Sequence, residues 1–178
     1  MKKERIEALK KLIKIALYFL AVSFLTRVVI LNAYVPSESM ENTLNVGDLL
    51  IGDRLAKTYR RGDILVFTRG NDNLVKRLIG LPGEHVEIKN NNVFINGKEL
   101  EEPYIKEEMN TNDRTFDVPE GEYLFLGDNR NNSLDARFWD YPYIMENNIK
   151  AKIVFRIWPL DKQCVFLSQR NKSKYESN

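Results

Sequence analysis

The chain has 178 residues, of which 43% are hydrophobic and 29% charged, with 9 Gly, 6 Pro, one Cys and one His. This composition excludes collagen, low-complexity disorder and a disulfide scaffold, and a chain of this length can bury a core of its own. One cysteine (Cys164) and one histidine (His85) do not make a Cys/His zinc site. We therefore expect neither a metal nor an organic cofactor.

The net charge of +2 averages two regions of opposite sign. Residues 1–14 carry six basic and two acidic side chains, a balance of +4, whereas residues 31–178 carry 20 basic and 23 acidic side chains, a balance of −3. A protein that binds nucleic acid gathers Lys and Arg on one face to replace condensed counterions. The slightly acidic main part of this chain therefore predicts no nucleic-acid partner.

Residues 15–35 (IALYFLAVSFLTRVVILNAYV) contain a single charge, at Arg27. A helix of this length would be about 31 Å long, enough to cross a hydrocarbon core of about 30 Å. A buried core helix and a cleaved secretory signal are the alternatives, but the run is apolar all round and the following LNAYVPSESM lacks the small residues that cleavage requires. The basic residues 1–14 belong on the cytoplasmic side. The sequence predicts a retained, single-pass plasma-membrane anchor with a cytoplasmic N-terminus and an extracytoplasmic domain over residues 36–160.

After the anchor, short β-rich runs alternate with turn signals, which predicts a mainly β domain. The predicted strands are residues 63–69, 74–79, 85–89, 92–95, 122–126 and 152–158. The pair Asn96-Gly97 predicts a type I′ hairpin turn, because both of its central residues need a positive φ. Residues 98–118 are acidic and lack apolar alternation, so we expect a small insertion there, and residues 161–178 form a polar tail.

Two polar residues are candidates for chemistry. In the predicted strand LVKRLI, alternation places Lys76 on one face with Leu74 and Leu78. Burial among apolar neighbours can lower a lysine pKa by roughly 3 to 5 units from about 10.4, toward the range of a general base. A neutral lysine amine can take the proton of a serine hydroxyl, and Ser39 is the candidate. Considered alone, Lys76 also fits an edge-strand lysine, and Ser39 a turn or helix N-cap.

A Ser-His-Asp triad would have to use His85, the only histidine. His85 begins a predicted hairpin strand, where a structural or solvated histidine is the more common case. The sequence therefore favours a lysine base over a histidine base.

Five features occur in order along the chain: the anchor, PSESM with TL downstream (36–44), VGDLLIGDRL with RGDILVF (46–67), KRLIGLPGE (76–84) and GDNRNNSLDAR (127–137). Together they resemble the bacterial type I signal peptidases in their short, single-anchor form, which are serine proteases with a Ser/Lys dyad. The resemblance covers nearly all of residues 11–158. It implies a β-rich catalytic unit of coiled antiparallel sheets with a smaller inserted β domain. It also implies a membrane-bound endopeptidase that removes signal peptides from secreted precursors and cuts after small residues.

The resemblance implies a role for each matching residue. Ser39 would be the nucleophile and Lys76 the general base, and the Ser37 hydroxyl and the Ser39 backbone N–H would stabilise the oxyanion. Supporting residues come from GDNRNNSLDAR: Ser133 would hold the lysine amine, Asp135 and Arg137 would form an ion pair behind the site, and Gly127 opens the motif. Shallow pockets for small side chains would be lined by Val35, Pro36, Met40, Leu44, Leu74 and Val75. Glu38, Ala136 and Asp140 depart from residues that are frequent in the family, without removing a catalytic group.

The expected partners are signal-peptide-bearing precursors, with the secretory translocon nearby, and membrane lipid. Aromatic rings are favoured at the lipid interface, and the candidates are Phe138, Trp139, Tyr141 and Tyr143.

Three alternative functions remain to be compared with this one. A self-cleaving, repressor-type Ser/Lys protease would carry a helix-turn-helix where this chain has its apolar segment. A sortase-like transpeptidase would use Cys164 and His85, but DKQCVFLSQ contains no matching motif. A membrane-tethered, non-enzymatic β module that binds a partner would make Ser39 and Lys76 ordinary turn and surface residues.

Overall fold

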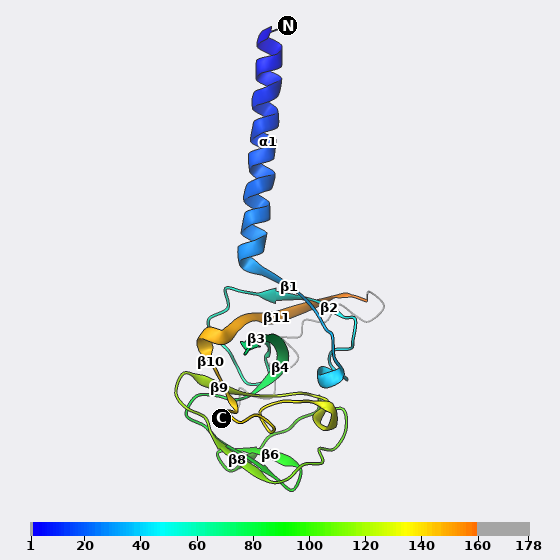
Figure 1. Cartoon of the computed structure of the whole chain (residues 1–178), viewed down its shortest axis with the longest axis vertical. Coiled ribbons are helices and arrows are strands. Elements are labelled where there is room, and N and C mark those ends of the chain that lie inside the picture. The colour runs from blue at the N-terminus through cyan, green and yellow to red at the C-terminus, as the bar shows by residue number, and fades with distance from the viewer. Residues whose placement is uncertain (1, 160–178) are drawn as a thin grey trace.

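The computed structural model describes residues 2–159, so the predicted polar tail and Cys164 lie outside the described residues. A single long helix, α1 (Lys2–Val29), projects from a β-rich body (Figure 1). Within its segment Arg5–Val29, an 18-residue window has a mean hydropathy of 1.9, and no part of that window is buried. Within the described residues, this is the one helix long and apolar enough to cross a membrane.

The helix ends earlier than the sequence predicts. Residues Ile30–Tyr34 form strand β1, which pairs antiparallel with β2 (Leu49–Asp53) from Ile30↔Asp53 to Tyr34↔Leu49. The prediction of one helix over residues 15–35 was therefore wrong for its last six residues. An apolar strand continues the hydropathy of the helix, and β-branched residues near position 30 favour the sheet once a partner strand is present.

Strand β1 is one edge of a seven-stranded antiparallel sheet with the order β1-β2-β11-β3-β4-β9-β10. The remaining strands are β3 (Ile64–Arg69), β4 (Asp72–Gly80), β9 (Glu122–Leu126), β10 (Tyr143–Met145) and β11 (Ile149–Trp158). Register shifts in β11 between Ile153 and Phe155 and between Arg156 and Trp158 bend and twist this sheet. The predicted mainly β fold is confirmed.

A second, four-stranded sheet lies at the end of the body farthest from α1 (Figure 1). Its order is β7-β6-β5-β8, with bounds Lys98–Glu99, Asn92–Ile95, His85–Lys89 and Arg114–Asp117. The turn Asn96-Gly97 has φ angles of 51° and 80°, as a type I′ turn requires. The predicted insertion at residues 98–118 was too narrow, because β8 pairs with β5 and draws residues 85–97 into the smaller sheet.

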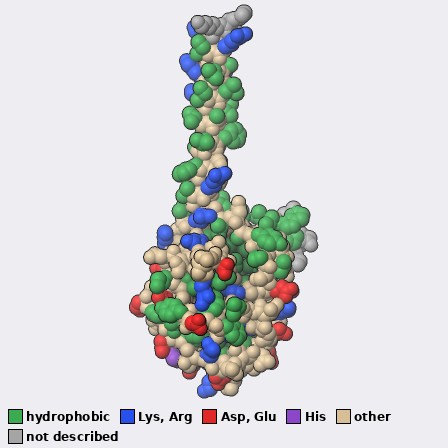
Figure 2. Space-filling model, in the orientation of Figure 1, with side chains coloured by type: hydrophobic (Ala, Val, Ile, Leu, Met, Phe, Trp, Pro, Cys, Tyr) green, Lys and Arg blue, Asp and Glu red, His purple; other side chains and the backbone are tan. Residues whose placement is uncertain are grey.

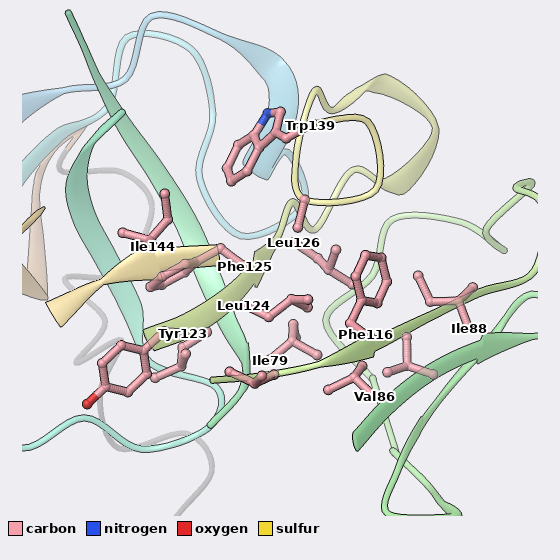
Figure 3. Close-up of a cluster of buried hydrophobic side chains, with 14 of the residues drawn as sticks. Ile79, Val86, Ile88, Phe116, Tyr123, Leu124, Phe125, Leu126, Trp139 and Ile144 are labelled. Atoms are coloured by element: carbon pink, nitrogen blue, oxygen red, sulfur yellow. The ribbon is translucent and has the colours of Figure 1, made fainter. Parts of the chain in front are cut away.

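One hydrophobic core joins the two sheets (Figure 3). Val86, Ile88 and Phe116 of the smaller sheet pack with Ile79 and Phe125 of the larger one. Trp139 belongs to this core and is 7% exposed, with its ring 6.3 Å from that of Phe67, so the prediction that Trp139 lies against lipid was wrong.

A second hydrophobic core lies on the opposite face of strand β3 in the larger sheet. Its buried members are Val35, Met40, Leu44, Leu50, Ile64, Val66 and Ile153. Because it contains Val35 and Met40, this core fixes the turn that carries Ser39.

Candidate active site

Ser39 lies in a short 3₁₀ helix, η1 (Glu38–Met40), directly after the second core's Val35. Val35 is fixed by two backbone hydrogen bonds, from its N–H to the Asp48 carbonyl and to its carbonyl from the Gly47 N–H, both 3.0 Å. Ser37 occupies the N-cap position and makes no capping bond with its side chain. Its hydroxyl instead lies 3.3 Å from the Ser39 hydroxyl. The N-cap interpretation of Ser39 was therefore wrong.

The backbone N–H of Ser39 is a free donor within η1. The first hydrogen bond of the helix runs from Glu41 N–H to the Glu38 carbonyl at 2.9 Å, so the N–H groups before it have no partner inside the helix. The Ser39 N–H and the Ser37 hydroxyl are thus two donors beside the Ser39 oxygen, as an oxyanion site requires.

Lys76 is buried in the middle of β4, with 3% of its surface exposed. Its Nζ donates a hydrogen bond to Ser133 Oγ at 3.0 Å. Burial lowers the pKa of Lys76 from 10.5 to about 8; the negative charge of Asp135 opposes this shift and the positive charge of Arg137 adds to it. A substantial fraction of the amine is therefore neutral in weakly alkaline solution, as a general base must be.

The next residue, Arg77, is also buried but is fully paired. Its guanidinium donates to both carboxylate oxygens of Asp128, at 2.8 and 2.6 Å, and to the Gly62 carbonyl at 2.7 Å. It also lies 3.9 Å from the ring centre of Tyr104. Sequence reasoning missed this pair, although each partner directly follows a residue that it had selected, Lys76 and Gly127.

The loop after β9 brings the predicted supporting residues together. Asp135 and Arg137 form a two-bond ion pair at 2.8 and 2.9 Å, and both are almost fully buried. Asp135 also accepts the Gly127 N–H at 2.9 Å. A Cβ at Gly127 would overlap both Ser133 Oγ and the Ser39 carbonyl. Glycine at this position lets η1, which carries Ser39, and the Ser133 loop approach each other.

Ser37, Ser39 and Lys76 line a pocket of about 530 Å³. Five of the six predicted apolar residues also line it: Val35, Pro36, Met40, Leu74 and Val75. The sixth, Leu44, does not line the pocket, because the chain turns back after η1 and buries this side chain completely in the second core.

Other lining residues were not predicted. They are Leu31, Asn32, Ala33 and Tyr34 of β1, Val66, Asn73, and the cations Arg54 and Lys150. The β1 residues were hidden because their hydropathy had been assigned to the anchor. A strand that forms one wall of the pocket was thus read as membrane helix.

Ser39 and Lys76 face the same pocket but have different hydrogen-bond partners in this conformation. Within the described part of the chain, Lys76 is bonded to Ser133 and Ser39 to Ser37. His85 lies on the smaller sheet with Nδ1 2.6 Å from Asp117 and does not line the pocket. Among residues 2–159, no three His, Cys, Asp or Glu side chains form a metal-binding group.

Comparisons with known proteins agree with a serine peptidase, a hydrolase. The model of the family described as "Signal peptidase, peptidase S26" matches residues 9–158. The chain belongs to this signal peptidase family.

Two relatives compared by sequence point the same way. A signal peptidase I from Leptolyngbya laminosa is 42% identical over 72% of this chain and 69% of its own length. A signal peptidase IB from Staphylococcus aureus is 34% identical over 91% of this chain and 94% of its own. The solved structure of a signal peptidase I from Enterococcus faecalis V583 is 34% identical, covering 54% of this chain and 97% of that one with a TM-score of 0.48.

Proposed function

We propose that this membrane-bound serine endopeptidase removes signal peptides from secreted precursors with Ser39 as nucleophile and Lys76 as general base. Neutral Lys76 takes the Ser39 proton while the Ser39 oxygen bonds to the scissile carbonyl carbon. The Ser37 hydroxyl and the Ser39 N–H stabilise the oxyanion. Protonated Lys76 then gives its proton to the leaving amine, and water releases the acyl group by the same route.

One observation carries these assignments: a lysine with a lowered pKa shares one pocket with a serine whose oxygen lies beside the Ser37 hydroxyl and its own backbone N–H. The proposed step requires the Ser39 side chain to rotate from Ser37 toward Lys76. Ser133 holds the amine through the bond at 3.0 Å, and the Asp135–Arg137 pair supports the loop behind it.

The apolar part of the pocket favours small side chains before the cut. Val35, Met40 and Val75 belong to, or pack against, the second core, so the pocket wall that they form is firmly packed. Large side chains at the first and third positions before the scissile bond would collide with this wall.

The proposed topology is a single membrane crossing by α1, with residues 1–14 in the cytoplasm and the β domain outside. Three exposed apolar side chains lie side by side across β1, β2 and β11 in the strand register: Tyr34, Leu49 and Trp158, at 58%, 40% and 55% exposure. They lie on β1, which follows α1, and on the two strands next to it, at the end of β1 away from the helix. We propose that they touch lipid in place of the buried Trp139. Figure 2 shows Lys and Arg side chains around the base of α1, where lipid headgroups would lie.

The activity test is incubation of the detergent-solubilised full-length protein with a secretory precursor, followed by mass measurement of the released N-terminal peptide. We expect cleavage after a small residue, and none with Ser39→Ala or Lys76→Ala. An inactive wild-type protein that still binds the precursor would support the non-enzymatic β module instead.

Two measurements test the topology. Protease added to intact protoplasts should degrade the β domain, and full protection would reverse the proposed orientation. In vesicles of brominated phospholipid, Trp158 fluorescence should be quenched while that of Trp139 is not. The variants Trp158→Phe and Trp139→Phe separate the two signals, and equal quenching of both would contradict the lipid contact.

A further inference from the structure

The nucleophile turn η1 is joined to a second short helix, η2 (Arg130–Asn132), by two asparagines. Asn129 is 1% exposed, and its backbone N–H donates to the Ser39 carbonyl at 3.1 Å. Its side-chain Nδ2 donates to the Glu38 carbonyl at 3.1 Å and also lies 3.4 Å from Glu41 Oε2. Both carbonyls that flank the Ser39 α-carbon therefore bond to Asn129, and the Glu38 carbonyl also accepts the Glu41 N–H at 2.9 Å.

The bond to the Glu38 carbonyl has a consequence for the oxyanion site. The Glu38 carbonyl and the Ser39 N–H belong to the same planar, trans peptide group, in which they point in opposite directions. Holding the carbonyl toward Asn129 therefore aims the N–H to the opposite side, away from the η2 loop. The donor proposed for the oxyanion is thus oriented by a side chain that touches neither substrate nor Lys76.

A second link joins the same two segments at the surface. Asn132 Nδ2 donates to Glu38 Oε2 at 2.9 Å, and Asn132 directly precedes Ser133, which holds Lys76 at 3.0 Å. Glu38, the residue before Ser39, is thus bonded to Asn132, the residue before Ser133. Its carboxylate is exposed, so this bond fixes geometry without burying a charge.

We propose that Asn129 and the Glu38–Asn132 pair are positioning residues that orient the Ser39 N–H and set the separation of Ser39 from Lys76. This proposal rests on the proposed function. Glu38 acts through its acceptor oxygen rather than through its negative charge. The Gly127 contact and these bonds together hold the η1 and η2 segments as one unit.

The test compares steady-state cleavage by full-length variants. Asn129→Asp puts an acceptor against the Glu38 carbonyl, and we expect kcat to fall about 10- to 100-fold with KM within about twofold. Asn132→Asp opposes two carboxylates, and we expect a fall of about three- to tenfold. Glu38→Gln keeps an acceptor oxygen and should stay within about twofold of wild type. The double variant Glu38→Gln/Asn132→Asp reverses the bond's direction and should restore kcat to the same range.

The pH profile separates positioning from charge. The limb of the rate profile that reports Lys76 should stay near pH 8 in Glu38→Gln. In Asn129→Asp and Asn132→Asp the added carboxylate raises the Lys76 pKa, so lost positioning is read as a lower kcat on the alkaline plateau, where Lys76 is neutral. Glu107→Gln is the matched control: it removes a nearby exposed carboxylate that bonds to neither helix, and it should behave as wild type.

Three results would overturn the proposal: wild-type kcat in both Asn variants, no recovery in the double variant, or a Glu38→Gln loss equal to that of Asn132→Asp. If Asn129→Asp fails to fold, the exposed Glu38 and Asn132 variants decide by themselves. Failure of the proposed function is a separate result, since wild type would then not cleave and Ser39→Ala would change nothing.

Discussion

Lys76 and Arg77 are neighbours on β4, equally buried at 3% and 5% exposure, and yet their surroundings differ completely. Arg77 has a carboxylate, a carbonyl and an aromatic ring as partners, whereas Lys76 has one neutral hydroxyl. The paired cation joins β4 to the loop after β9. The poorly paired cation has its pKa lowered to about 8. Burial alone does not decide the role of a charged side chain; the partners that the fold provides do.

Replacing Lys76 by Met should break the chemistry and spare the fold. We expect precursor cleavage to fall about 1,000-fold or more, because Lys76 is the one buried amine among the described residues that line the pocket with Ser39. The melting temperature should stay equal or rise, since a poorly compensated buried charge is removed. Lys98→Met, on the exposed strand β7, is the control with normal activity. Cleavage above one hundredth of wild type by Lys76→Met, a threshold of about 3 kcal/mol in barrier, would contradict the assignment.

Replacing Arg77 by Met should destabilise the fold instead of removing a group that acts in the chemistry. It leaves the Asp128 carboxylate buried without its guanidinium, which costs about 3 to 5 kcal/mol in the free energy of unfolding. Urea titration of the detergent-solubilised protein measures this loss. Arg77→Met/Asp128→Asn should recover much of it, and the exposed Arg114→Met should change stability little. A loss below about 1 kcal/mol for Arg77→Met would show that the pair is not essential to the fold.

Removing the Ser133 hydroxyl, the hydrogen-bond partner of Lys76 within the described residues, should lower the activity less than removing Lys76 itself. Ser133→Ala leaves the amine without the bond that holds it, and we expect kcat to fall about 10- to 100-fold while the free energy of unfolding changes little. Thr115→Ala, which removes an exposed hydroxyl on β8 of the smaller sheet, serves as the control. Unchanged kcat would mean that packing alone orients Lys76.

The smallest expected effect that separates the two cations is the change of kcat/KM with pH. Only neutral Lys76 accepts a proton, so with a pKa of about 8 the value of kcat/KM should rise about tenfold between pH 7 and pH 9 and then level. Because the folded-state pKa lies below the ordinary 10.5, the unfolded chain binds more protons between these values, and the free energy of unfolding should rise with pH there. Lys76→Met should lose that rise. A rate that is flat from pH 7 to pH 9 would exclude Lys76 as the base.

Part of this contrast was predictable from the sequence. Strand alternation placed Lys76 among leucines, and the lowered pKa agrees with that reasoning. Alternation also assigned Arg77 to the opposite face, but it could not show that this face is buried too. The partner Asp128 lies 51 residues away in sequence, and only the pairing of β4 with β9 brings it close.

The strand predictions also succeeded where the signal lies in the local sequence and failed where it depends on a distant partner strand. Strands with dense β-branched residues and clear turns were predicted correctly, as was the Asn96-Gly97 hairpin turn. Four strands were missed, β1, β2, β8 and β10, and they depend on partners elsewhere: β1 and β2 on each other, β8 on β5 and β10 on β9. Leu44 was assigned to the pocket for a related reason, since the direction of a side chain after a tight turn depends on which core lies beneath it.

The junction between α1 and β1 has a practical consequence for anyone who wants a water-soluble version of the enzyme. The Val29 carbonyl accepts the Arg54 N–H at 2.9 Å and the Ile30 carbonyl accepts Arg54 Nε at 3.3 Å, so the last helical residue is already bonded to the sheet. A truncation made at residue 36, where hydropathy alone would end the anchor, deletes strand β1 and one wall of the pocket that Ser39 and Lys76 line. Cutting just before Val29 keeps both, and should yield a crystallisable, active fragment.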